Sequence, residues 1–182
     1  PKNIIYELEK GFDIALKDRP GPVWIDIPID IQGELVSEKN LKIYKPKFYT
    51  KKNSTKKKDL SKLSKLITSS KRPVFWFGNG IKLSKSEHFL TSVLKKYPFP
   101  FFLSWAAIDM IDTNHKLNFG RPGVYGNRAS NLILQNSDLI ISIGTRMSIP
   151  MIGYSHKEFA RKAKIIHVDI DNTELLKLKN KT

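Results

Sequence analysis

The sequence predicts an α/β protein built on a parallel sheet with helices on both faces. Short runs such as Pro73–Phe77 and Asp138–Ile143 are nearly continuous in apolar residues, which is typical of strands buried on both sides. These runs alternate with segments of helical periodicity, as expected when each strand is followed by a crossover helix. Most of the runs end at glycine or at acidic residues, which are common where a strand turns into a helix.

The N-terminal part predicts one helix and one strand. Residues Asn3–Leu16 carry an apolar stripe at helical spacing, and Arg19–Pro22 ends that helix. Val23–Ile27 then has the composition of a short strand, closed by Pro28. Because a lone helix and strand cannot bury their own apolar faces, we expect them to pack on an upstream segment or on a partner chain. From residue 31 to 57 few structure-forming signals occur, and this stretch is the predicted domain boundary.

The next elements follow in a regular order. We expect Asp59 to cap a helix, and Pro73–Phe77 to form a buried strand that meets Gly78-Asn79-Gly80. Ser84–Glu87 has the pattern of a capping box that opens a second helix. Phe99–Leu103 is the following strand, and a long loop comes after it.

The last third of the chain continues the alternation. Gly120–Gly126 introduces a helix whose inner face is predicted at Ala129, Leu132 and Ile133. The remaining elements are a strand at Asp138–Ile143 ending at Gly144, a short helix around Phe159 and Ala160, a strand at Lys164–Asp169, and a helical turn from Asn172.

Composition excludes several function classes. The 182 residues contain no cysteine, so disulfide scaffolds, thiolate catalysis and cysteine zinc sites are ruled out. The four histidines show no metal-binding spacing, and no apolar run approaches the roughly 18 residues of a membrane span. Because Pro1 and the residues after it form neither an initiator methionine nor a signal peptide, we expect an internal piece of a longer, soluble, cytoplasmic protein.

The formal charge of +15 suggests a polyanion binder at face value. Between Lys39 and Lys65, however, eleven lysines accompany one acidic residue, Asp59, and the segment Tyr49–Lys58 lacks apolar periodicity. Only six basic residues in the whole chain are arginine, the residue preferred for bidentate phosphate and base contacts. The pattern favours a solvated linker over a specific nucleic-acid site, and a basic polyanion-binding module stays as a minor alternative.

The predicted site lies where strands end, because ligands of open parallel sheets bind outside the carboxyl ends of strands. Glycines let backbone approach a diphosphate, arginine neutralises it, and an acid accepts hydrogen bonds from ribose hydroxyls. The candidate nucleotide-binding residues are Gly78, Asn79, Gly80, Gly144, Thr145, Arg146, Asp169 and Ile170.

Each candidate has an alternative structural role. Gly78 and Gly80 are equally suited to a tight turn, and Arg146 to a surface ion pair. Asp169 and the nearby Asp171 are equally suited to cap the helix that begins at Asn172. His167 lies in an apolar strand and is expected to be a core residue. Among the tryptophans, only Trp105, at a strand exit, is a candidate pocket wall.

A nicotinamide-dependent oxidoreductase is the first alternative function. Gly78-x-Gly80 follows a strand and precedes a helix, as the dinucleotide fingerprint requires. The third glycine position is Leu83, however, and the second strand ends at Ser104 instead of an acid. The sequence also contains no nucleophile elbow, phosphate-binding P-loop or paired-carboxylate pattern, so we predict no catalytic residue and no metal ligand in this chain.

Four phrases resemble the acetolactate synthase-like family of thiamine diphosphate enzymes. Gly21–Gln32 is similar to the end of that family's N-terminal, pyrimidine-binding domain. Arg72–Gly80, Asn136–Arg146 and Ala163–Asp171 are similar, in order and spacing, to phrases of its central, Rossmann-like domain. The resemblance divides the chain into the tail of the N-terminal domain (1–35), a lysine-rich linker (36–57) and a central domain truncated at its C-terminal end (58–182).

The resemblance implies a homodimeric or tetrameric enzyme that uses thiamine diphosphate and Mg²⁺ to decarboxylate a 2-oxo acid and transfer the fragment. It implies FAD, an adenine nucleotide, CoA or no ligand in the central domain. The family's activating glutamate and its Gly-Asp-Gly metal motif lie outside these 182 residues, so this piece alone is expected to be inactive. Gly78-Asn79-Gly80 stands where the family has three glycines, and Met147–Tyr154 where the synthases have an acid-rich phrase, which indicates a divergent relative.

Overall fold

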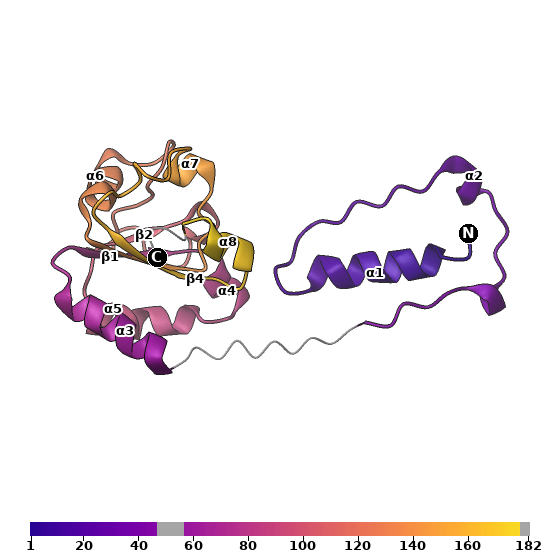
Figure 1. The fold of residues 1–182 in the computed structure, drawn as a ribbon, viewed down its shortest axis with the longest axis horizontal. Helices are drawn as coiled ribbons and strands as arrows, with labels where there is room; N and C mark the ends of the chain where they lie inside the picture. Colours follow the sequence, from indigo (N-terminus) through magenta and orange to yellow (C-terminus); the bar gives the residue numbers. More distant parts are fainter. Residues whose placement is uncertain (47–56, 179–182) are drawn as a thin grey trace. The chain divides into compact units, whose positions relative to one another are not determined.

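The computed structural model describes residues 1–46 and 57–178. The chain divides into two compact units, Pro1–Ser54 and Thr55–Thr182, which are considered separately below (Figure 1). Residues 47–56 of the predicted lysine-rich linker lie outside the described residues, as do residues 179–182.

The first unit contains the predicted helix, α1 (Ile4–Leu16), and two short helical turns, α2 (Ile29–Gln32) and η1 (Glu38–Asn40). The predicted strand at Val23–Ile27 is wrong: these residues lie alongside α1 and pair with no strand in the described part of the chain. A strand needs a neighbouring strand to satisfy its backbone N–H and C=O groups, and residues 1–46 of this unit supply none. The helix instead packs through Gly11, where an added Cβ would lie 2.8 Å from Ile25 Cδ1.

Much of the apolar surface of this unit is not buried within it. Phe12, Trp24, Ile29 and Leu35 are all exposed. This exposure agrees with the expectation that one helix and one extended segment cannot cover their own apolar side chains.

The second unit is a four-stranded sheet in which all strands are parallel, so the predicted fold class is confirmed. The strand order is β2-β1-β3-β4. The strands are β1 (Pro73–Phe77), β2 (Phe101–Leu103), β3 (Leu139–Ile143) and β4 (Lys164–Val168). The outer edge of β2 is covered by the following loop, where Phe101 N donates to Leu117 O and Leu103 N donates to Gly120 O. The outer edge of β4 pairs with no strand among the described residues.

Helices cover both faces of this sheet (Figure 1). The helices α3 (Lys57–Ser69) and α5 (Leu90–Lys96) pack on one face, around Phe75, Phe77 and Leu139. The helices α6 (Arg128–Asn136) and α7 (Ile149–Ile152) pack on the other, around Trp76, Phe102 and Ile140. The remaining elements are α4 (Gly80–Leu83), η2 (Glu87–Phe89), η3 (Trp105–Ala107) and α8 (Asn172–Leu176). Alternate residues of β1 therefore belong to two separate cores, as expected for a doubly covered sheet.

The predicted helix starts are partly wrong. Asp59 lies inside the first turn of α3, which already includes Lys57. The capping box at Ser84–Glu87 is absent, because the Ser84 hydroxyl donates to Ile81 O (2.9 Å) at the end of α4. The helix α5 begins only at Leu90. The sequence spacing correctly indicated a polar turn here. The Ser84 side chain, however, bonds to the preceding helix α4 and not to the start of α5.

The predicted inner face of α6 is partly wrong, and so is the predicted helix at Phe159 and Ala160. Ile133 is half-buried and packs against the core as predicted. In α6 the buried residues are Ser130 and Leu134, while Ala129 and Leu132 are exposed. The Ser130 hydroxyl reaches the Arg121 carbonyl oxygen at 2.6 Å, and this bond turns a polar residue inward. Phe159 and Ala160 are buried in a turn, not in a helix.

Asp138 connects the start of β3 to the turn before β1. Its carboxylate accepts hydrogen bonds from the backbone N–H groups of Lys71 (2.7 Å) and Arg72 (2.9 Å). Partial burial would raise the pKa of Asp138, but these two hydrogen bonds favour the charged form and hold the pKa below its ordinary value.

Asp138→Ala is expected to lower the free energy of unfolding by about 2 kcal/mol at neutral pH, because two backbone donors lose a charged acceptor. The pKa is lower in the folded state, so this contribution is complete above the unfolded-state pKa, about 4, and is lost as the pH falls through the folded-state pKa. Urea unfolding of both proteins between pH 7 and pH 2.5 measures the difference. Glu158→Ala, which removes only an exposed ion pair with Arg161, is the control, and an equal loss in the two variants would contradict the assignment.

Candidate functional site

The loops that leave β1 and β3 lie in direct backbone contact. Gly78 N donates to Ile143 O (2.9 Å) and Gly80 N donates to Gly144 O (3.0 Å). A Cβ at Gly78 would collide with the Gly144 carbonyl oxygen and lie 2.5 Å from Thr145 Cα. Gly144 itself has φ +60°, in the left-handed region that favours glycine. The tight-turn role of these glycines is thus observed, whether or not a ligand also approaches them.

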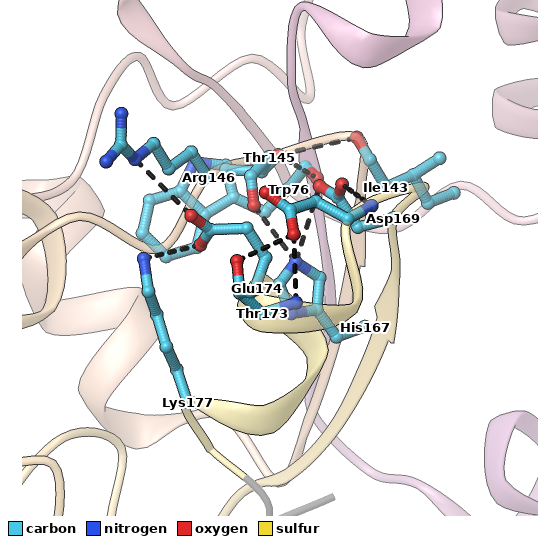
Figure 2. Close-up of polar contacts among 10 residues, drawn as sticks. Trp76, Ile143, Thr145, Arg146, His167, Asp169, Thr173, Glu174 and Lys177 are labelled. Atoms are coloured by element: carbon cyan, nitrogen blue, oxygen red, sulfur yellow. Dashed lines mark hydrogen bonds and ion pairs between the residues drawn. The ribbon is translucent and has the colours of Figure 1, made fainter. Parts of the chain in front are cut away.

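Thr145 faces the core, not the solvent. Its buried hydroxyl donates to the Trp76 carbonyl oxygen at 3.0 Å. Its own carbonyl oxygen lies 3.0 Å from His167 Nε2 (Figure 2). Only the backbone N–H of Thr145 is left for a ligand, and its side chain anchors the loop that carries Arg146.

Arg146 combines an exposed side chain with a buried partner. The side chain is 66% exposed, and its Nε lies 3.4 Å from Glu174 Oε1, whose side chain is 3% exposed. Lys177 Nζ approaches the other oxygen of Glu174 at 2.6 Å (Figure 2). The ion-pair alternative for Arg146 is therefore observed. Sequence reasoning missed Glu174 and Lys177, since nothing in a short helical turn indicates that its glutamate will be buried.

Asp169 points inward. Its side chain is 8% exposed, Oδ1 accepts from Asp171 N (2.9 Å), and Oδ2 lies 3.9 Å from His167 Nε2. Asp171, by contrast, caps α8 by accepting from Thr173 N at 2.9 Å, as one of the predicted alternatives required. Ile170 between them is exposed. In this conformation the Asp169 carboxylate is held by the protein and is not presented to a ribose.

Several backbone donors at this edge are free to meet an anion. In the described part of the chain, the N–H groups of Asn79, Thr145 and Arg146 donate to no protein acceptor. Backbone N–H groups beside an exposed guanidinium suit the oxygens of a phosphate. The site residues therefore fit the phosphate part of a nucleotide, whereas Asp169 does not fit the ribose part as it is placed.

An aromatic cluster lies beyond the end of β2. The Arg121 guanidinium carbon lies 5.1 Å from the centre of the Trp105 ring, and Tyr125 meets the same ring edge-on at 6.1 Å. Trp105 and Tyr125 are both exposed. The sequence indicated Trp105 as a pocket wall, and the structure adds the two residues that a long loop brings to it.

Other site classes find no support in the described residues. Residues 1–46 and 57–178 contain no group of three or more histidine, aspartate or glutamate side chains placed to hold a metal ion. Within the same ranges, every helix is too short or too polar to span a lipid bilayer.

The parallel sheet, its two helical layers and the glycine turns at its carboxyl edge define a Rossmann-like α/β domain. Residues 60–182 match the family model described as "Thiamine pyrophosphate enzyme, central domain". The chain belongs to this family of thiamine pyrophosphate enzymes, and the resemblance on which the sequence interpretation depended is confirmed.

The chain is also similar to several acetolactate synthases. It is 34% identical over 172 residues to the acetolactate synthase isozyme 1 large subunit of Escherichia coli, covering 94% of this chain. It is 38% identical over 168 residues to a probable acetolactate synthase large subunit of Methanococcus aeolicus, covering 91% of this chain. These alignments cover only 30% and 28% of the two relatives, so the chain corresponds to less than a third of their length.

Proposed function

We propose that this chain is part of a thiamine diphosphate- and Mg²⁺-dependent enzyme of the acetolactate synthase kind, which decarboxylates a 2-oxo acid and joins or transfers the product. The similarity to acetolactate synthase large subunits over more than 90% of the chain carries this proposal. Thiamine diphosphate, when bound, supplies the carbanion chemistry that loss of CO2 requires.

The role of this piece in such an enzyme is structural. We assign residues 58–182 to the scaffold that holds the other domains and subunits, and the thiamine diphosphate and Mg²⁺ sites to segments outside the chain. Pro1–Thr182 alone should therefore release no CO2 from a 2-oxo acid, while the complete polypeptide should do so with both cofactors present. A complete polypeptide that is inactive with both cofactors on pyruvate and on 2-oxobutyrate would contradict the enzyme assignment.

The homo-oligomeric state and the cytoplasmic location belong to the same proposal. Acetolactate synthase-like enzymes are expected to act as dimers or tetramers, and the exposed apolar residues of the first unit would then face other parts of the assembly. Light scattering of the complete polypeptide tests the oligomeric state, and a monomer would contradict it.

We further propose that the carboxyl edge of the sheet binds FAD or another adenine nucleotide. The contact residues would be Gly78, Asn79, Gly80, Gly144, Thr145, Arg146, Asp169 and Ile170. The open backbone N–H groups of Asn79, Thr145 and Arg146 and the exposed guanidinium support a diphosphate at this edge. Binding would require the Asp169 side chain to turn outward from its present hydrogen bond if it is to reach a ribose.

Arg146→Ala is expected to weaken nucleotide binding by about tenfold to a hundredfold, because one charge-assisted contact is lost. Calorimetric titration of the complete polypeptide with FAD and with ADP measures the effect. Arg161→Ala is the control, since Arg161 is also an exposed arginine in an ion pair, with the exposed Glu158 in a different loop. If neither nucleotide binds at millimolar concentration, the nucleotide site is wrong while the family assignment remains.

A further inference from the structure

Three polar side chains form a continuous row across the sheet. In the strand register Trp76 of β1 lies beside Ser142 of β3, and Ser142 lies beside His167 of β4. Residues in register on adjacent parallel strands point to the same face, so all three side chains enter the same layer. Trp76 and Ser142 are fully buried, and the His167 side chain is 1% exposed.

Each of the three carries a buried polar atom without a protein partner. Among the described residues these atoms are Trp76 Nε1, Ser142 Oγ and His167 Nδ1, and only Arg121 Nε shares the same condition elsewhere. Buried polar atoms in folded proteins are nearly always hydrogen-bonded, and leaving one unpaired is costly. Three such atoms in neighbouring positions of one row therefore indicate a common missing partner.

The chemistry of the three atoms identifies that partner. The Thr145 carbonyl oxygen can only accept, so the hydrogen of a neutral His167 ring belongs on Nε2, which leaves Nδ1 as an acceptor. The Trp76 indole can only donate, and the Ser142 hydroxyl can do both. A water molecule has two hydrogens to donate and two lone pairs to accept, so it can accept from the indole, donate to the imidazole and bond the hydroxyl in either direction.

The spacing suits a water as well. Ser142 is on the middle strand of the three, so one strand spacing of about 4.8 Å separates it from Trp76 on one side and from His167 on the other. A water that makes two hydrogen bonds of about 2.8 Å connects groups up to about 5.6 Å apart. We propose that one buried water molecule binds in the sheet between Trp76 Nε1, Ser142 Oγ and His167 Nδ1.

This water has a consequence for the strand-end loop. By donating to Nδ1 it holds His167 in the tautomer whose Nε2 hydrogen bonds the Thr145 carbonyl, and Thr145 precedes Arg146 in the loop after β3. The Ser142–His167 pair is thus a positioning element and not a nucleophile with its base, because neither side chain reaches solvent.

A crystal structure of the complete polypeptide at about 1.8 Å resolution or better tests the proposal. One ordered water is expected within about 3.3 Å of at least two of the three atoms. Ser142→Ala should keep this water, because the indole and the imidazole remain. Ser142→Val should remove it, because the added methyl groups fill its place. Ser137→Ala is the control: its buried hydroxyl is already bonded to Leu134 O (2.7 Å), so the water should be unchanged.

Two results would overturn the water site. One is a parent structure with no density between the three side chains. The other is a Ser142 hydroxyl bonded directly to His167 Nδ1, which leaves no space for a water. The parent crystal alone decides between these outcomes if the Ser142→Val variant does not fold.

Discussion

Gly78→Ala is expected to lower the free energy of unfolding of the sheet-containing unit by at least about 3 kcal/mol. The new methyl group would collide with the Gly144 carbonyl oxygen, and its neighbours are backbone atoms that cannot rotate away. Relief requires the loops after β1 and β3 to separate, which breaks the hydrogen bonds that Gly78 N and Gly80 N donate across the contact. Forcing an atom into a close-packed interior commonly costs 1–3 kcal/mol, and the lost hydrogen bonds add to this.

Urea unfolding of Pro1–Thr182, followed by far-ultraviolet circular dichroism, measures this loss. Gly21→Ala is the matched control, because a Cβ at Gly21 would meet no atom within 4 Å. The control should stay within about 0.5 kcal/mol of the parent. If Gly78→Ala were equally stable, the contact between the two loops would be wrong.

Trp76→Ala is expected to cost about 4 kcal/mol. The indole is fully buried between Phe102 and Phe159, with ring centres 6.5 and 6.4 Å away, so its removal leaves a large cavity in one of the two cores.

The chain contains its own control for this substitution. Trp24 is 87% exposed, so Trp24→Ala in Pro1–Thr182 should change the unfolding free energy by about 0.5 kcal/mol or less. Chemical unfolding of both variants, monitored by circular dichroism because fluorescence would change with the tryptophan itself, gives the comparison. Equal costs at the two positions would mean that Trp76 is not a core residue.

The sheet was predictable from sequence because its strands are buried on both faces. A run such as Leu139–Ile143 has almost no polar residue, and few other structures accept such a run. The segment at Val23–Ile27 has the same local composition, but no strand in the described part of the chain pairs with it. Composition therefore identifies residues suited to a strand, whereas the presence of a partner decides whether the strand forms.

The candidate site was predictable in its backbone and not in its side chains. A glycine at a strand end indicates that another part of the molecule or a ligand comes close to its backbone. In this structure the backbones of Gly78 and Gly144 are in close contact with each other. The orientation of Asp169 and the burial of Glu174 depend on contacts between segments distant in sequence or on the path of a short loop. No spacing rule contains that information.

The outer edge of β4, which pairs with no strand in residues 1–46 and 57–178, has a consequence for the behaviour of the chain in solution. The backbone N–H and C=O groups along such an edge can pair with a strand from another molecule, and natural proteins usually cover or interrupt edges for this reason. Lys164 places a positive charge at the beginning of β4, while apolar Ile165 and Ile166 continue the strand. We expect this edge to favour aggregation of separate copies of Pro1–Thr182 when they are concentrated, independently of any ligand at the glycine turns.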